Sequence, residues 1–285
     1  MLNESYKLSN GVLIPKLGLG TWLIDNDKVA SAVKDAIEVG YKHIDTAEAY
    51  ENEEGVGEGI RSCSLDRSEI FITTKVRAEY KTYDSAKSAI DESLSKMGLD
   101  YIDLVIIHSP EPWMEFRSGK NYDKENIEVW RALEDAYNEG KVRAIGVSNF
   151  LISDLQNILD NCEIKPMVNQ ILAHISCIPF ELIEFCQKHD ILVEAYSPIA
   201  HGAANNSDKI KEIANKYNVS VAQLCIKYVL DLGLIALPKT ENREHMITNA
   251  QVDFTISKED MEELNSLKDA IDYGKDKVFP VFSGK

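Results

Sequence analysis

Long apolar runs are missing from this chain of 285 residues, and none reaches the 18 residues that a membrane-spanning helix needs. Its first residues, MLNESYKLSNG, do not lead from a charged segment into an apolar one, as a signal peptide does. We therefore expect a cytoplasmic protein that does not bind a membrane. The chain also lacks linkers, repeats and low-complexity stretches, and its length is near that of one large α/β barrel. We expect a single domain over residues 1–285.

Cysteine is sparse and has no recognisable spacing. The five cysteines form no C-x-x-C pair and no metal-ligand pattern, so we expect reduced thiols and no metal site. Positive charge is scarce too, because 31 Lys and Arg residues face 47 Asp and Glu residues and give a net charge of -16. This balance argues against nucleic acid or an anionic membrane as a partner. It says nothing about protein partners.

Short apolar, β-branched runs alternate with amphipathic segments along the chain. Two short alternating runs come first, and the Asn10-Gly11 pair between them predicts a hairpin because both residues tolerate positive φ. Eight strand candidates follow, at residues 17–20, 42–46, 70–75, 102–108, 142–148, 167–171, 191–197 and 234–238.

The segments between these strands have the spacing of helices. In one of them, Ala86, Ala89, Ile90 and Leu94 recur at helical intervals. The helix candidates include residues 27–39, 53–62, 84–97, 125–139, 179–188 and 257–268, with two extra ones at 207–217 and 220–231 between the seventh and eighth strands. This alternation predicts the α/β class and a (β/α)8 TIM barrel with an N-terminal β-hairpin and two extra helices.

Four polar residues lie at or near the ends of three of these strands. Asp45, Lys75 and His108 stand at the ends of the second, third and fourth strand candidates, and Tyr50 follows Asp45 by five residues. Because strand ends meet at one face of a parallel barrel, we expect the four side chains to converge on one pocket.

Together these side chains have the chemistry to protonate a carbonyl oxygen as it becomes an alkoxide. A free phenol has a pKa of about 10, and a nearby ammonium such as that of Lys75 favours the phenolate and lowers this pKa. Asp45 can keep Lys75 charged away from water. A neutral His108 can orient the carbonyl and help to hold the developing negative charge.

Seven motifs of this chain resemble those of the aldo-keto reductases in order and spacing. They are GYKHIDTAEAYENEEGVGEGI, ITTK, LVIIH, GVSNF, MVNQI, EAYSP and LPKT, and the similarity runs from the hairpin to about residue 270. The short segment between Tyr196 and Asp208 is similar to that of the shorter, 2,5-diketo-gluconate-reductase-like bacterial members. The resemblance implies NADPH-dependent reduction of aldehydes or ketones to alcohols. The four polar residues are then catalytic, the hydride comes from the nicotinamide and the proton comes from Tyr50.

The resemblance also assigns a cofactor site. Ser148, Asn149 and Gln170 match the residues that bind the nicotinamide carboxamide, and Tyr196 matches the ring that stacks on the nicotinamide. Near the 2′-phosphate, His245 stands where the family usually has an arginine, so NADPH is the expected cofactor and NADH is possible. The complete set is Gly20, Thr21, Trp22, Asp45, Ser148, Asn149, Gln170, Tyr196, Ser197, Ile199, Lys239, Thr240, His245 and Asn249.

A pocket for a small carbonyl substrate is implied at Trp22, Tyr50, Arg77, His108 and Trp113. Arg77 stands where aromatic residues are common in the family, and we expect its guanidinium to favour substrates that carry an anion or several hydroxyls. The loop of residues 109–125 is long and carries aromatic residues, as substrate-binding lids often do.

Other interpretations remain open. A nucleotide-binding barrel without catalysis, as in a channel subunit or a structural protein, accounts for the fold but not for the four polar residues. Lys75 could be the Schiff-base lysine of an aldolase, and Ser148 and Asn149 could cap the helix that follows them. The glycines of residues 55–59 have the wrong spacing for a dinucleotide-binding G-x-G-x-x-G loop, so we assign them no phosphate.

Overall fold

A two-stranded antiparallel hairpin opens the chain in the computed structural model, which describes residues 1–116, 118–268 and 270–274. Its strands are β1 (Ser5–Lys7) and β2 (Leu13–Pro15). In the turn, Gly11 adopts a φ of +92° and the Asn10 side chain accepts a hydrogen bond from the Val12 amide at 3.1 Å. The predicted hairpin is confirmed, and Gly11 supplies the positive φ that its turn requires.

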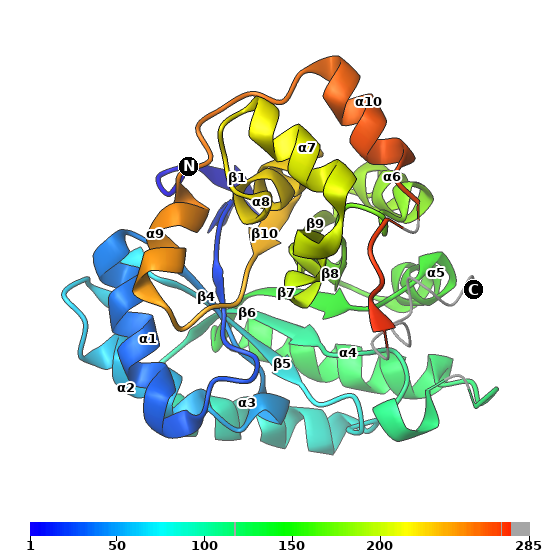
Figure 1. Ribbon diagram of the computed structural model, residues 1–285. Coiled ribbons are helices and arrows are strands. Elements are labelled where there is room, and N and C mark those ends of the chain that lie inside the picture. Colours follow the sequence, from blue (N-terminus) through cyan, green and yellow to red (C-terminus); the bar gives the residue numbers. More distant parts are fainter. Residues whose placement is uncertain (117, 269, 275–285) are drawn as a thin grey trace.

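Eight parallel strands form the barrel that follows (Figure 1). They are β3 (Leu19–Gly20), β4 (His43–Asp45), β5 (Phe71–Val76), β6 (Ile102–Ile107), β7 (Val142–Ser148), β8 (Val168–Leu172), β9 (Leu192–Tyr196) and β10 (Ile235–Leu237). The barrel closes between the segment before β3 and β10, where the Ala236 amide donates to the Lys16 carbonyl and the Gly18 amide donates to the Ala236 carbonyl, both at 3.0 Å. The predicted (β/α)8 barrel is confirmed.

Helices connect the strands and surround the barrel. They are α1 (Asn26–Val39), α2 (Glu53–Arg61), α3 (Tyr83–Met97), α4 (Asp123–Asn138), α5 (Ile152–Asn161), α6 (Phe180–Lys188), α7 (Asp208–Lys216), α8 (Val221–Asp231), α9 (Arg243–Ala250) and α10 (Lys258–Ser266). Helices α7 and α8 lie between β9 and β10, in the connection where the sequence predicts two extra helices.

Helix α9 is one that the sequence pattern does not reveal. Of its residues only Met246 and Asn249 are buried, so it has almost no apolar face. Its start is set instead by Asn242, whose side chain accepts hydrogen bonds from the amides of Glu244 and His245 at 2.8 and 3.3 Å.

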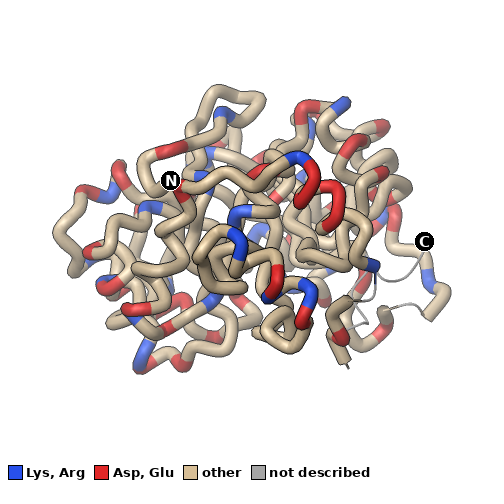
Figure 2. Tube along the Cα trace, turned by 45° about the horizontal axis from the view of Figure 1, so that its top comes forward, with Lys and Arg blue, Asp and Glu red and all other residues tan. Residues whose placement is uncertain are grey.

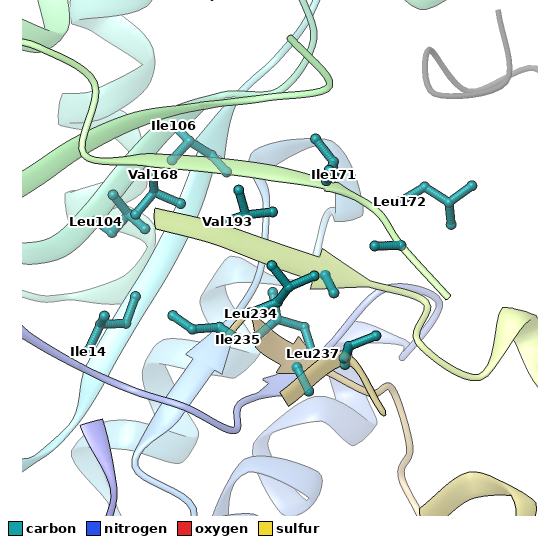
Figure 3. Packing of buried hydrophobic residues seen from close by; sticks show 14 of the residues in the cluster. Ile14, Leu104, Ile106, Val168, Ile171, Leu172, Val193, Leu234, Ile235 and Leu237 are labelled. Atoms are coloured by element: carbon teal, nitrogen blue, oxygen red, sulfur yellow. The ribbon is translucent and has the colours of Figure 1, made fainter. Parts of the chain in front are cut away.

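Apolar side chains fill the barrel and the layer between strands and helices. Figure 3 shows buried apolar side chains from four different strands of the barrel, among them Ile106, Val168, Val193 and Ile235. Each of them is at most 2% exposed. One face of each parallel strand is covered by the barrel interior and the other by helices, so the strands are nearly continuous apolar runs in the sequence. This packing fixes where the strands end, and so it positions the polar residues at their carboxyl ends.

The glycine-rich helix α2 packs very closely on its neighbours. A Cβ on Gly55 would collide with the Asn26 carbonyl in α1, and a Cβ on Gly57 would collide with the Met97 carbonyl at the end of α3. Close helix packing therefore accounts for these glycines without a phosphate-binding role.

Acidic and basic residues are interspersed along the chain trace in Figure 2. In the described part of the chain, no helix is both long and apolar enough to cross a membrane.

No group of three or more His, Cys, Asp and Glu side chains among these residues could hold a metal ion. That nucleic acid is not a partner stays a prediction from the net charge of -16. The predicted single domain also stays a prediction, and residues 275–285 lie outside the described part.

Candidate active site

The four polar residues meet at the carboxyl ends of the strands. Asp45 is the last residue of β4, Lys75 lies near the end of β5, and His108 directly follows β6. Tyr50 ends the short 3-10 helix η1 (Glu48–Tyr50), which contacts β5. Parallel pairing of β4, β5 and β6 thus brings together side chains that are far apart in the sequence.

Lys75 lies at the centre of this group and is 1% exposed. Its Nζ donates hydrogen bonds to Asp45 Oδ2 and to the Thr46 carbonyl, both at 2.7 Å, and to the Tyr50 hydroxyl at 3.3 Å. A buried ammonium is stable only when other groups replace its hydration. Three oxygens do so here, one for each N–H of the ammonium.

The environment of Lys75 keeps it charged. Burial by itself lowers the pKa of Lys75, but Asp45 and Tyr50 outweigh this effect and raise the pKa above its ordinary value. A Schiff-base lysine must lose its proton and reach the substrate. Lys75 holds its proton beneath Tyr50, so the structure argues against the aldolase interpretation.

The pKa of Tyr50 is raised above its ordinary value. Burial is the main cause, Lys75 acts in the opposite direction, and the Asp45 carboxylate adds to the rise. The expectation that Lys75 lowers the pKa of the phenol therefore holds for its own contribution but not for the net effect. At neutral pH the Tyr50 hydroxyl carries its proton, which is the form that an acid catalyst needs.

His108 is a neutral imidazole in this site. Burial lowers its pKa well below the ordinary value, and the positive charges of Lys75 and Arg77 lower it further. Its ring lies 5.7 Å from the ring of Tyr50 and 5.7 Å from that of Trp113, in edge-to-face arrangements. A neutral imidazole has one N–H, so His108 can serve as a hydrogen-bond donor beside the Tyr50 hydroxyl.

A cavity of about 940 Å³ lies over this group. Its lining extends from Tyr50 and His108 to Lys239 and His245, which follow β10. The predicted site residues that line it are Gly20, Trp22, Asp45, Tyr50, His108, Trp113, Ser148, Asn149, Gln170, Tyr196, Ser197, Ile199, Lys239, Thr240, His245 and Asn249. One cavity thus unites residues that the sequence assigns to catalysis, to the cofactor and to the substrate.

Thr21 and Arg77 are not among the described residues that line this cavity. Thr21 is fully buried, and its hydroxyl donates to the Asp45 carbonyl at 3.0 Å, so it supports the backbone beneath the site. Arg77 pairs with Glu48 at 3.4 Å and with Glu51 at 3.5 Å. These two carboxylates hold the guanidinium aside, and the structure does not bring Arg77 into the predicted substrate pocket.

Hydroxyl and amide groups form a network in the middle of the cavity lining. Asn149 Nδ2 donates to Ser148 Oγ at 3.0 Å and to the His108 carbonyl at 3.1 Å, and the Tyr196 hydroxyl donates to Asn149 Oδ1 at 2.7 Å. Asn149 has a φ of +61°, a left-handed conformation that asparagine tolerates better than most residues. These groups both donate and accept hydrogen bonds, so they suit a ligand that carries an amide.

The start of α5 rules out the helix-cap interpretation of Ser148 and Asn149. Leu151 is the N-cap residue, and the Asp154 side chain accepts a hydrogen bond from the Leu151 amide at 2.9 Å. The Ser148 hydroxyl instead donates to the Gln170 carbonyl at 2.8 Å and so joins β7 to β8.

The segment after β10 adds positive charge to the cavity. Lys239 and His245 line it there. Arg243 lies between them in the sequence but points elsewhere, because its guanidinium pairs with Asp35 and Glu38, both at 2.8 Å. A cationic lysine and an imidazole that can donate a hydrogen bond suit a phosphate group.

Sequence reasoning missed several residues of this region, and His201, Leu23 and Glu194 are examples. His201 lines the cavity with its ring 5.1 Å from that of Trp22, and it lies in the irregular segment η4 (Ala200–Asn206), which has no periodic pattern. Leu23 also lines the cavity and is 72% exposed. Glu194 lies inside the barrel and accepts a hydrogen bond from Gln170 at 2.9 Å. A lone acidic residue in the apolar strand ILVEAY is a signal that could have found it.

Comparison with known proteins agrees with this geometry. The model of the aldo/keto reductase family matches residues 16–269. The glyoxal reductase of Bacillus subtilis (strain 168) is 42% identical over 268 residues, which are 93% of each chain. The methylglyoxal reductase DkgA of Escherichia coli (strain K12) is 37% identical over 273 residues, which are 95% of each chain. The crystal structure of a Bombyx mori aldo-keto reductase in complex with NADP is similar with a TM-score of 0.86 and 33% identity, and the match covers 98% of each chain.

The family match spans the barrel. The two similar reductases match this chain over nearly their whole length. The predicted use of NADPH is supported by the similarity to a structure that contains NADP. The alternative of a barrel without catalysis is not supported. The chain belongs to the aldo/keto reductase family, and it is an NAD(P)H-dependent oxidoreductase that reduces carbonyl groups.

Proposed function

We propose that this protein reduces small 2-oxoaldehydes, such as glyoxal and methylglyoxal, with NADPH, and that Tyr50 supplies the proton. The observation that carries the proposal is the chain of hydrogen bonds from Asp45 through Lys75 to Tyr50, at 2.7 and 3.3 Å, beside a cavity that Tyr50 shares with His108. Two similar proteins of nearly equal length are named for the reduction of glyoxal and of methylglyoxal.

In this proposal Tyr50 and Lys75 divide the work of proton transfer. The proton moves from the Tyr50 hydroxyl to the substrate oxygen, and the negative charge stays on the phenol oxygen next to the Lys75 ammonium at 3.3 Å. Lys75 therefore stabilises the phenolate that the reaction leaves behind. Asp45 keeps the ammonium charged through its hydrogen bond at 2.7 Å.

His108 orients the carbonyl group as a second hydrogen-bond donor. Its Nδ1 is buried and has no hydrogen-bond partner among the described residues. Because a buried N–H without an acceptor is costly, we assign the ring proton to Nε2. A donor at this position stabilises the negative charge that develops on the carbonyl oxygen.

NADPH, when bound, supplies the hydride. The residues along the cavity fit it chemically, because Ser148, Asn149 and Gln170 offer the donors and acceptors that a carboxamide needs. Lys239 and His245 fit the charge of the 2′-phosphate. Ser148, Asn149 and Gln170 would thus hold the reactive end of the cofactor, and Lys239 and His245 would distinguish NADPH from NADH.

The walls of the cavity support the proposed substrate class. Trp22, Leu23, Ala49 and Trp113 line it together with Tyr50. Among the described residues, no arginine lines it. A small neutral dicarbonyl needs no cationic group, whereas a keto acid gains affinity from one.

A panel of carbonyl compounds tests this proposal, with turnover measured by NADPH oxidation. The panel contains methylglyoxal, glyoxal, a simple aldehyde, a keto sugar and a keto acid. We expect kcat/KM for the two 2-oxoaldehydes to exceed that for the keto acid by about tenfold or more. A higher kcat/KM for the keto acid or the keto sugar would reject the substrate class. Turnover retained by Tyr50→Phe would instead reject the proton donor.

We also propose the cytoplasm as the place of action. The five cysteines are free thiols, and three of them are buried. Reducing conditions preserve such thiols. Cell fractionation with an antibody against the chain tests this proposal, and recovery outside the cytoplasm would contradict it.

A further inference from the structure

Glu194 is an acidic residue in the middle of β9, and 0% of it is exposed. Its Oε2 accepts a hydrogen bond from Gln170 Nε2 at 2.9 Å. The same nitrogen donates to Asp45 Oδ1 at 2.7 Å. One amide group thus joins two buried carboxyl groups, and both of its N–H bonds are used inside the barrel.

The surroundings of Glu194 keep it neutral. Burial raises its pKa to about 8, and the Asp45 carboxylate adds to the rise, while Lys75 acts against it. His43 faces Glu194 from β4, with Nε2 3.7 Å from Glu194 Oε1, and burial lowers the pKa of His43 to about 3. At neutral pH Glu194 is therefore protonated beside an uncharged imidazole, and its Oε1 has no hydrogen-bond partner among the described residues. This leaves Oε2 as the acceptor for Gln170.

We propose that Glu194 is a positioning residue that holds the Gln170 amide with Nε2 toward the barrel interior and Oε1 toward the cavity. There Oε1 accepts a hydrogen bond from the nicotinamide carboxamide, so the inference rests on the proposed role of Gln170. Gln170 lines the cavity and its Nε2 is committed to two acceptors, which leaves Oε1 for a ligand. Without Glu194 the Gln170 amide loses one of these acceptors and can rotate by 180°. Its N–H groups then face the cavity, where the carboxamide of the cofactor needs an oxygen.

Two ligands separate this role from a general effect on the protein. NADPH contains the nicotinamide, whereas 2′,5′-ADP carries only the adenosine half with the 2′-phosphate. Gln170 belongs to β8, and the predicted phosphate contacts such as Lys239 follow β10. A change in the orientation of Gln170 therefore weakens NADPH and spares 2′,5′-ADP. A distorted barrel weakens both.

The first experiment measures the Kd values of both ligands for Glu194→Leu. We expect about tenfold weaker binding of NADPH, which corresponds to the loss of one buried hydrogen bond, and an unchanged Kd for 2′,5′-ADP. Thr73→Val is the matched control, because the Thr73 hydroxyl lies in the same interior, where its Oγ1 is hydrogen-bonded to His43 Nε2 at 3.0 Å rather than to Gln170. It should change neither Kd. Equal weakening of both ligands in Glu194→Leu, or of neither, overturns the proposal.

The second experiment is rescue by Glu194→Gln. The new amide stays neutral, offers its oxygen to Gln170 and its nitrogen to the side of His43, and so copies the protonated carboxyl group. We expect its Kd for NADPH to lie within about twofold of the wild-type value, since the hydrogen bond to Gln170 is kept. A loss as large as in Glu194→Leu overturns the proposal.

Gln170→Leu separates a failure of this proposal from a failure of the proposed function. If Gln170→Leu leaves the Kd for NADPH unchanged, the carboxamide contact itself is wrong. If it weakens NADPH while Glu194→Leu does not, only the role of Glu194 is wrong. Because Glu194 acts through Gln170, the double variant should bind NADPH no more weakly than Gln170→Leu alone. Additive losses contradict the proposed coupling.

Discussion

The Tyr50 hydroxyl lies 3.3 Å from the Lys75 ammonium, and the two groups differ in their access to the cavity. Tyr50 lines it, whereas Lys75 is 1% exposed and lies beneath the phenol. Substrate can therefore reach the hydroxyl but not the ammonium. In the proposed mechanism Tyr50 therefore transfers the proton, and the Lys75 ammonium stabilises the phenolate that remains.

Tyr50→Phe should lower kcat for carbonyl reduction by about 10²- to 10⁴-fold, the usual contribution of a general acid. The phenyl ring keeps the packing against His108, so the Kd for NADPH should not change. Turnover is measured by NADPH oxidation and Kd by quenching of protein fluorescence. If kcat stays near the wild-type value, the proton comes from another group.

Lys75→Met should affect both activity and stability. The pKa of Tyr50 rises further without the ammonium, and Asp45 is left as an unpaired buried carboxylate, which costs about 3–5 kcal/mol of stability. The double variant Asp45→Asn/Lys75→Met removes both charges and should recover much of the stability but not the activity. Urea unfolding and turnover measure the two effects. Recovery of turnover in the double variant would show that the ammonium is not needed for proton transfer.

His245→Arg should increase the preference for NADPH over NADH by about tenfold, because guanidinium is always charged and binds phosphate with two hydrogen bonds. His245 lines the cavity as Lys239 does, but an imidazole cannot bind one phosphate with two hydrogen bonds. The preference is measured as the ratio of the Kd values for the two cofactors. An unchanged ratio in His245→Arg means that this position does not contact the 2′-phosphate.

Glu194 should make the free energy of unfolding depend on pH. Its pKa rises from the ordinary 4.5 to about 8 on folding, so the folded state keeps a proton that the unfolded state releases. The associated stability is fully present below about pH 4.5 and is lost as the pH rises to about 8, with a slope of at most about 1.4 kcal/mol per pH unit. Glu194→Gln cannot titrate and should lack this component. Urea unfolding of both proteins across this range tests it, and a constant difference between them would show that Glu194 titrates normally.

The barrel and the four polar residues at its strand ends could be predicted from the pattern of residues along the chain. Apolar, β-branched runs mark strands wherever both faces are buried, and the predicted strand ends agree with the structure to within two residues. Because strands of a parallel barrel present their carboxyl ends at one face, the positions of Asp45, Lys75 and His108 in the sequence sufficed to predict their convergence.

The partners of the polar side chains could not be predicted from the sequence, because they depend on how the closed barrel brings distant strands together. The sequence predicts that Arg77 enters the substrate pocket, but Glu48 and Glu51 come within 3.5 Å of it and hold it aside. Glu194 meets Gln170, and Gln170 meets Asp45 across 125 positions of the chain. The periodicity of apolar residues along the sequence indicates only which face of a strand or helix is buried. Hydrogen bonds and charge pairs between distant strands depend on which side chains the closed barrel brings within reach, and these contacts in turn set the pKa values of the site.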